Sequence, residues 1–160
     1  MTTQINFYES KGRIESTIPG IQREFVQKYA KTTMNSSIQA NGGTKLLAET
    51  SIDRTVRIKN AKIWFDEISS SITEENSAIQ CNCGIRITNG SSPKLITMAA
   101  TAMVANNVII TKFPDTEFFT LPAGYYLELN ILIIPIKTGT LPTSSDMFIT
   151  NFSCELEYPI

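Results

Sequence analysis

The stretch GYYLELNILIIPIK, from Gly124 to Lys137, is the most apolar predicted strand of the chain, and the fold is inferred outward from it. Its first part alternates: the odd-numbered residues 125–133 are aromatic or aliphatic, whereas Tyr126, Glu128 and Asn130 between them carry polar groups. Alternation with a period of two residues is typical of a β-strand with one buried face. The sequence therefore predicts a strand here whose apolar face packs into a core.

The second face of this strand also becomes apolar, because Leu132, Ile134 and Ile136 follow. A strand that is apolar on both faces needs cover on both. Pro135 cannot donate a hydrogen bond to a ladder, so we expect this end of the strand at an edge, a bend or a bulge. The cover is either the chain's own N-terminal segment or a partner subunit. We favour the partner, with Leu132, Ile134 and Ile136 as subunit-contact residues.

Length and composition indicate one β-rich domain. The chain has 160 residues, 14 basic and 15 acidic side chains and a net charge of −1, so no overall charge attracts it to nucleic acid or to an anionic membrane. It has no apolar run of membrane-spanning length, and its first residues lack the pattern of a signal peptide. We therefore expect synthesis in a host cytoplasm, and we expect neither nucleic acid nor a membrane as a partner.

Residues 1–45 are polar and interrupted, and we interpret them as an N-terminal arm that precedes a β-sandwich domain over residues 46–160. Ile21, Phe25 and Tyr29 recur every four residues after Pro19, which predicts a short helix near residues 20–31. That helix either packs on its own domain or docks on a neighbouring subunit, in which case Ile21, Phe25 and Tyr29 are the arm-contact residues. The arm lacks the dense basic run of a nucleic-acid arm.

The domain is expected to begin after Asn41-Gly42-Gly43, which has the composition of a turn. In the following strand the apolar phase changes near Asn60, which indicates a turn or bulge. Under that register Trp64 points outward as a contact or ligand-stacking residue. Under another register Trp64 belongs to the core.

Further strands are predicted over residues 78–88, 94–106, 108–113 and 147–158, and the alternative for residues 94–106 is a helix. Asn89-Gly90, Asn106-Asn107 and the run from Leu121 to Gly124 have the composition of turns. Roughly eight strands at spacings of about 8 to 12 residues are typical of a sandwich or barrel. The fold class is therefore all-β, an antiparallel β-sandwich.

The run FTLPAGYYLEL, from Phe119 to Leu129, resembles the turn and strand of jelly-roll domains similar to tumour-necrosis-factor and C1q heads, and of phage virion fibres and capsid-decorating proteins. This resemblance covers about a tenth of the chain. It implies a jelly-roll-like sandwich and a trimer built around apolar strands. An arm followed by one jelly roll also resembles small virion proteins.

The residue types needed for most catalysis are scarce. The chain has no histidine, which removes Ser-His-Asp and Cys-His nucleophiles. Cys81 and Cys83 share the apolar face of their predicted strand, so we interpret them as small buried hydrophobes, with a redox pair between Cys83 and Cys154 as the alternative. Asp66, Glu67, Glu74 and Glu75 lack the spacing of a calcium loop. We expect no enzyme, no metal and no other cofactor.

These observations favour a non-enzymatic structural virion protein, such as a capsid-associated, decorating or fibre component of a phage or virus. It would form a homo-oligomer, most simply a trimer, and attach to other virion proteins through its arm. The alternative is a β-sandwich module that binds a carbohydrate or another cell-surface ligand and stacks it on Trp64.

Overall fold

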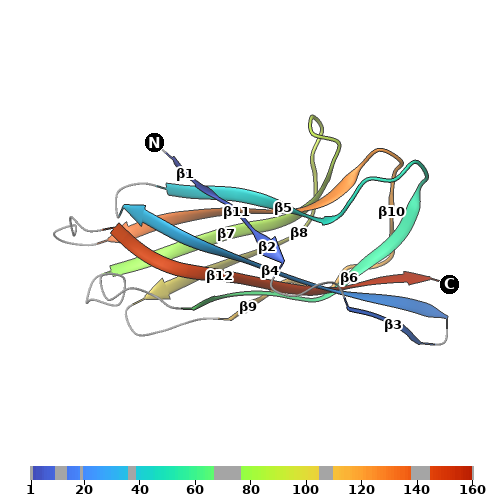
Figure 1. The fold of residues 1–160 in the computed structure, drawn as a ribbon, viewed down its shortest axis with the longest axis horizontal. Helices are drawn as coiled ribbons and strands as arrows, with labels where there is room; N and C mark the ends of the chain where they lie inside the picture. Colours follow the sequence, from blue (N-terminus) through green and yellow to red (C-terminus); the bar gives the residue numbers. More distant parts are fainter. Residues whose placement is uncertain are drawn as a thin grey trace.

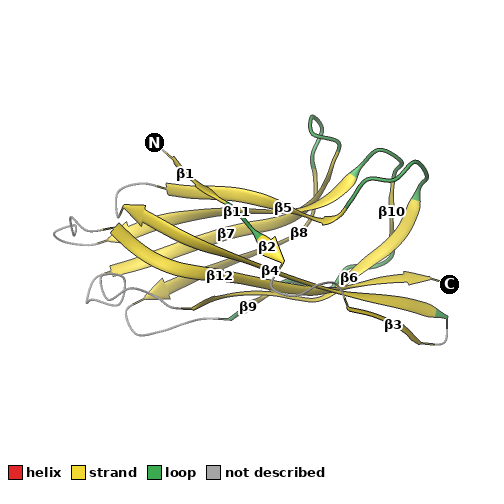
Figure 2. Cartoon of the chain, in the orientation of Figure 1, coloured by secondary structure: helices red, strands yellow, loops and turns green. Residues whose placement is uncertain are grey.

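The computed structural model describes residues 2–9, 14–18, 20–35, 39–66, 77–104, 110–137 and 145–159. In this part of the chain every regular element is a strand (Figure 2), so the predicted all-β class is confirmed. No helix long and apolar enough to cross a membrane occurs among the same residues. The strands are β1 (Thr2–Ile5), β2 (Tyr8–Glu9), β3 (Ile14–Ile18), β4 (Ile21–Asn35), β5 (Gln39–Leu47), β6 (Arg54–Asp66), β7 (Ser77–Thr88), β8 (Lys94–Val104), β9 (Thr111–Lys112), β10 (Phe119–Leu121), β11 (Tyr126–Lys137) and β12 (Ser145–Pro159).

Two sheets form the sandwich (Figure 1). The five-stranded sheet has the order β1-β5-β11-β7-β8, and the seven-stranded sheet has the order β10-β6-β12-β4-β2, with β3 also paired to β4 and β9 to β6. Consecutive strands mostly change sheet, so that β5-β11-β7-β8 is packed against β4-β12-β6-β10. Two four-stranded halves connected in this way are a double-sheet jelly roll. The predicted jelly-roll-like sandwich is therefore confirmed.

The core lies between the sheets, and β11 supplies its centre as predicted. Leu127, Leu129, Ile131 and Ile133 are fully buried, and they face side chains such as Phe152 from the other sheet. The alternate residues of β11 point away from the core and are partly exposed. The alternation in the sequence of β11 therefore corresponds to an inner and an outer face of this strand.

The predicted helix near residues 20–31 is wrong, because these residues lie in β4. A period of four is also a multiple of two, so Ile21, Phe25 and Tyr29 share one face of a strand as readily as one face of a helix. The opposite face holds Val26 and Ala30, which are buried in the core. Pairing of β4 with β12 along its whole length, from Ile21 to Asn35, decides between the two structures.

The predicted turn at Asn41-Gly42-Gly43 is also wrong, since all three residues lie within β5. Gly42 is needed there for close packing rather than for a turn. A Cβ atom on Gly42 would lie 2.3 Å from the carbonyl oxygen of Ile5, the residue of β1 with which it pairs. Both β4 and β5 are strands of the sandwich, so a domain boundary at residue 45 would fall inside β5.

Several other predicted elements can be compared with the structure. Residues 94–104 form a strand, and Gly90 and Gly124 have φ values of 98° and 82°, as their predicted turns require. In the predicted strand over residues 108–113, Thr111 and Lys112 pair with β6. The predicted turn at Asn106-Asn107 lies outside the described residues, as does most of the acidic stretch after Asp66.

Candidate interaction surfaces

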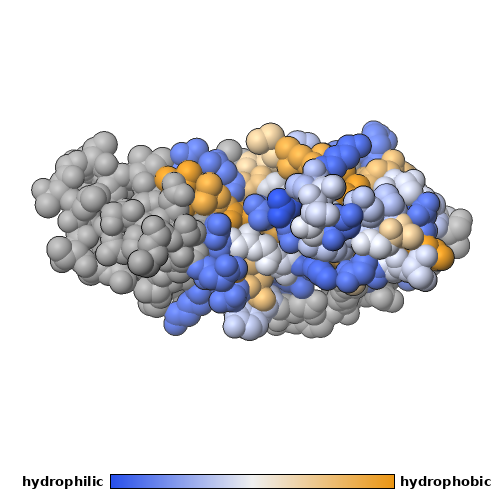
Figure 3. All heavy atoms as spheres, turned by 90° about the horizontal axis from the view of Figure 1, so that it is seen from above, coloured by the Kyte–Doolittle hydropathy of each residue, from blue (hydrophilic) through white to orange (hydrophobic). Residues whose placement is uncertain are grey.

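On the face of the molecule that Figure 3 shows, small clusters of hydrophobic residues lie among hydrophilic residues. This mixed distribution is usual for a protein surface. More distinctive surfaces occur on the outward faces of the two sheets, where strand register brings together side chains that are distant in the sequence.

The first candidate surface is a groove on the outward face of the five-stranded sheet. It has a volume of about 280 Å³, and we call it the β7–β8–β11 groove after its strands. Leu95 and Met98 expose 55% and 62% of their surface, and Leu132 and Ile134 are half-buried on the same face. The groove is lined by Asn82, Cys83, Gly84, Leu95, Met98, Ala99, Asn130 and Leu132.

Gly84 shapes the floor of this groove. The Cδ1 atom of Leu95 lies only 2.7 Å from where a Cβ atom on Gly84 would be, so the leucine side chain lies directly over the glycine. A larger residue at position 84 would push Leu95 away and change the groove. Neither Leu95 nor Met98 was predicted as a surface residue, because the ambiguous pattern of residues 94–106 assigned no face to them.

Charged groups lie beside the groove on β7 and β11, and a further charged group lies on β5. The Nη2 atom of Arg86 lies 2.6 Å from Oε1 of Glu128, and these residues face each other across β7 and β11. Further along, the Nζ atom of Lys45 lies 4.4 Å from the ring centroid of Tyr126 and 3.0 Å from a carboxylate oxygen of Glu49. An apolar centre with a polar border is the usual anatomy of a protein interface.

The structure also places the other predicted subunit-contact positions. Ile136 lies opposite Ala78 in the ladder between β11 and β7, but its side chain is outside the described residues. The described pairs with β5 run from Leu127 to Ile133, and on the other side of β11 Pro135 lies opposite Ile79 of β7. β1 extends the sheet beside β5.

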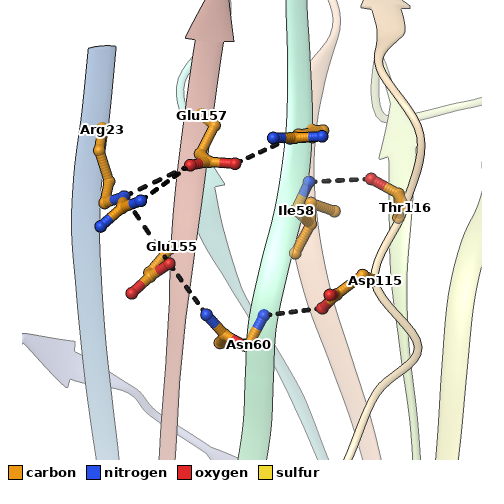
Figure 4. A network of polar contacts seen from close by, with 8 residues as sticks. Arg23, Ile58, Asn60, Asp115, Thr116, Glu155 and Glu157 are labelled. Atoms are coloured by element: carbon orange, nitrogen blue, oxygen red, sulfur yellow. Dashed lines mark hydrogen bonds and ion pairs between the residues drawn. The ribbon is translucent and has the colours of Figure 1, made fainter. Parts of the chain in front are cut away.

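The second candidate surface is the outward face of the seven-stranded sheet, where β4, β12 and β6 lie side by side. A polar network occupies one end of it (Figure 4). Glu157 of β12 accepts hydrogen bonds from Arg57 at 2.8 Å and from Arg23 at 3.2 Å. The guanidinium of Arg57 also lies 4.6 Å from the ring centroid of Phe118. These neighbours leave only 2% of the Glu157 side chain exposed, although it points away from the core.

Burial disfavours the charged form of Glu157 and by itself would raise the pKa of its carboxyl group. The hydrogen bonds from Arg57 and Arg23, together with the positive charges of Arg57 and Lys59, outweigh that effect. The pKa of Glu157 is therefore lower than its ordinary value of 4.5. The carboxylate stays ionised at neutral pH, and its hydrogen bonds connect β12 with β6 on one side and with β4 on the other.

Asn60 marks the predicted change of phase in β6, and a bulge is confirmed there. Its φ angle is 52°, and the register between β12 and β6 shifts between Ser153 and Glu155. The displaced backbone N–H of Asn60 donates to Asp115 at 2.9 Å, and its Nδ2 atom donates to Glu155 at 3.0 Å. Asparagine is one of the few residues besides glycine that adopt this left-handed conformation readily.

The bulge places Trp64 on the outward face, as the first of the two predicted registers requires. Ile63 and Phe65 on either side are buried, whereas Trp64 is partly exposed, with the Nζ atom of Lys62 5.2 Å from its ring centroid. Trp64 starts a row across the sheet, because Asn151 lies opposite both Trp64 and Tyr29, and Tyr29 lies opposite Tyr8. The sequence had no signal for this row, since its members come from four strands.

The three predicted arm-contact residues all lie on the outward face of β4 and are partly exposed. Ile21 and Phe25 lie beside β3, where Phe25 is opposite Ile14 and 5.9 Å from the guanidinium carbon of Arg23. Tyr29 lies further along, beside β2, with its ring centroid 5.9 Å from that of Tyr8. The three residues therefore spread along the strand instead of forming one cluster.

The cysteines have the buried positions expected of small hydrophobes. All three are free thiols, and Cys83 and Cys154 lie in strands of different sheets. The neighbouring thiol of Cys83 and burial both raise the pKa of Cys81, which keeps that thiol protonated. Within the described residues, no cluster of three cysteine or acidic side chains could hold a metal ion.

Of the comparisons with known proteins, only the one with solved structures found similarity to this chain. No protein-family description and no curated protein sequence matches the chain. A chain of infectious bursal disease virus, Gt strain, is similar over 97% of this chain and 33% of its own length, with 8% identity and a TM-score of 0.43. A chain of Desmodium yellow mottle tymovirus is similar over 94% of this chain and 97% of its own, with 13% identity and a TM-score of 0.40. The chain thus spans about a third of the bursal disease virus chain and nearly all of the tymovirus chain.

Proposed function

We propose that this protein is a non-enzymatic structural component of a phage or virus particle that assembles as a homo-oligomer, most simply a trimer. The β7–β8–β11 groove carries this proposal. Leu95 and Met98 are more than half exposed, and Leu132 and Ile134 lie on the same outward face of the five-stranded sheet. A second copy of the chain seated there would bury these side chains and remove an exposed apolar surface.

The fold supports the virion part of the proposal. Double-sheet jelly rolls are typical of viral capsid domains, although they also occur in lectins and cupins. A fold alone does not establish a function. The groove, with its charged border of Arg86 and Glu128, adds a surface suited to association between subunits. Attachment to other virion proteins would use the N-terminal part of the chain, with Ile21 and Phe25 as contacts on the outward face of β4.

Light scattering on the purified protein tests the subunit contact. We expect an oligomer for the natural chain and a folded monomer for Ile134→Asp, because burying a carboxylate in an apolar interface is unfavourable. Met98→Asp is a second groove variant at a more exposed position, and Ile52→Asp is the matched control, since Ile52 is 68% exposed on a loop away from the groove. An oligomer that persists in both groove variants, or a natural chain that is already monomeric, would contradict the proposal.

The outward position of Trp64 favours a second candidate function, the binding of a carbohydrate or another cell-surface ligand. An exposed aromatic ring can stack on a sugar through its face. Trp64 is the chain's one tryptophan, so its fluorescence reports on this position directly. A change in fluorescence on titration with neutral oligosaccharides would support this candidate, and an unchanged signal would count against it.

A further inference from the structure

Two lysines face each other on the outward side of the seven-stranded sheet. Lys62 of β6 and Lys112 of β9 are directly opposite in the antiparallel ladder. Like charges in such a pair are destabilising. Lys112 is exposed, and neither lysine forms an ion pair with another described residue. The Nζ atom of Lys62 lies 5.2 Å from the ring centroid of Trp64. An anion between the two lysines would relieve their repulsion.

The aromatic row lies two residues further along the same face. It crosses β6, β12, β4 and β2 through Trp64, Asn151, Tyr29 and Tyr8. Tyr8 is 60% exposed, and its ring packs against that of Tyr29. Adjacent strands are about 4.8 Å apart, so Trp64 and the tyrosine pair are separated by about 10 Å. The face therefore offers aromatic rings at two positions beside a pair of positive charges.

The other charged groups of this face largely engage one another. Arg23 and Arg57 bind Glu157, and Glu155 accepts from Asn60. Asp66 accepts a hydrogen bond at 2.7 Å from Asn151, and Asp115 accepts from the backbone of Asn60. Lys59 and Lys31 add positive charge on either side, opposite Glu155 and Ile149 respectively. The two lysines beside Trp64 are thus cations of this face without an acidic partner among the described residues.

We propose that this face binds a single-stranded nucleic acid, with phosphates at Lys62 and Lys112 and bases stacked on Trp64 and on the Tyr8–Tyr29 pair. Cations that follow a backbone and aromatic rings that stack on bases are the two features of single-strand binding surfaces. A neutral glycan could stack on the rings, but it would not compensate the positive charges of the two lysines. A duplex would offer phosphates, but its paired bases could not reach the rings.

This inference goes beyond the proposed function and does not depend on the proposed subunit contact, which lies on the opposite sheet. It also revises the expectation that the protein has no nucleic-acid partner. That expectation came from the overall charge and from the lack of a basic run in the arm. Lys62 and Lys112 are far apart in the sequence, and only the pairing of β6 with β9 brings them together.

Titration of the full chain with a single-stranded thymidine dodecamer tests the proposal. We expect quenching of the Trp64 fluorescence and an affinity that falls with salt. Each phosphate contact contributes about 0.7 to the slope of log K against log salt for single strands. The double variant Lys62→Ser/Lys112→Ser should therefore lower that slope by about 1.4. Lys94→Ser is the matched control, because Lys94 is an exposed lysine on β8 of the other sheet.

A labelled dodecamer measures the stacking contribution through fluorescence anisotropy. Trp64→Leu should weaken binding about tenfold or more, whereas Trp64→Phe, which keeps a ring, should lose less. Circular dichroism confirms that each variant is folded. Absence of binding by the natural chain, equal losses in Lys94→Ser and the double variant, or equally tight binding of a matched duplex without quenching would each overturn the proposal. Quenching by a neutral oligosaccharide but not by the dodecamer would overturn it in favour of a glycan.

Discussion

The Nε atom of Arg57 lies 2.8 Å from Oε1 of Glu157, on the outward face of a sheet where the carboxylate is nevertheless almost completely buried. Arg57 belongs to β6 and Glu157 to β12, and Arg23 of β4 completes the contact from the other side. The carboxylate therefore joins three neighbouring strands that are far apart in the sequence. Its burial results from the side chains around it, since it lies outside the hydrophobic core.

Replacing Glu157 by glutamine should lower the free energy of unfolding by about 1.5 to 3 kcal/mol, because a buried carboxylate that accepts hydrogen bonds from two charged donors is lost. Urea unfolding measures the change. Glu155→Gln is the control: Glu155 is 19% exposed and lies 3.8 Å from Arg23, so its loss should be below about 1 kcal/mol. Equal effects of the two substitutions would contradict the central role of Glu157.

The same carboxylate should make stability depend on pH. Because the pKa of Glu157 is lower in the folded protein than its ordinary value of 4.5, its contribution is complete above that pH and is lost as the pH falls through the folded pKa. Urea unfolding at about pH 7 and about pH 3 should therefore show a larger loss for the natural chain than for Glu157→Gln. Parallel losses in the two proteins would rule out this contribution.

The conformation of Asn60 leads to a comparison between two variants. Alanine and glycine both remove the hydrogen bond from Nδ2 to Glu155, but alanine alone is strained at a φ of 52°. Asn60→Ala should therefore be less stable than Asn60→Gly by about 1 kcal/mol. Thermal unfolding of both variants measures the difference, and no difference would show that the backbone relaxes at the bulge.

Gly42 should be intolerant of any side chain. Its Cβ atom would lie 2.3 Å from the carbonyl oxygen of Ile5, so Gly42→Ala should detach β1 from β5 and expose Ile5. We expect a loss of about 1 to 3 kcal/mol and faster proteolysis near the N-terminus. Gly43→Ala is the neighbouring control, because its closest approach is a milder 3.1 Å. Unchanged proteolysis of Gly42→Ala would contradict the tight pairing of β1 with β5.

The thiol of Cys81 should be unreactive in the folded protein, because Cys83 and burial raise its pKa and only the thiolate reacts. Iodoacetamide at about pH 8 should leave Cys81 unmodified in buffer and alkylate it in denaturant. Peptide mass spectrometry distinguishes the three cysteines. Alkylation of Cys81 in the folded protein at the rate seen in denaturant would show that β7 opens readily.

Sequence alone determined the local features of this fold. Alternation in β11, β12 and β7 specified which side chains face the core, since side chains along a strand point to opposite sides whatever the strand pairs with. The shift of phase at Asn60 indicated the bulge, and the runs around Gly90 and Gly124 indicated turns, because each depends on a few adjacent residues. The lack of histidine excludes histidine-activated nucleophiles in any fold that this chain could adopt.

Tertiary structure decided what depends on pairing between distant residues. Ile21, Phe25 and Tyr29 fit a helix or a strand equally well by spacing, and pairing with β12 selected the strand. The run Asn41-Gly42-Gly43 has the composition of a turn, and only the position of Ile5 against Gly42 shows that this glycine serves close strand packing. The groove around Leu95 and Met98, the carboxylate between two arginines and the lysine pair beside Trp64 all arise from strand register. Register is set by the whole sandwich, because a shift of one residue would turn every buried side chain outward.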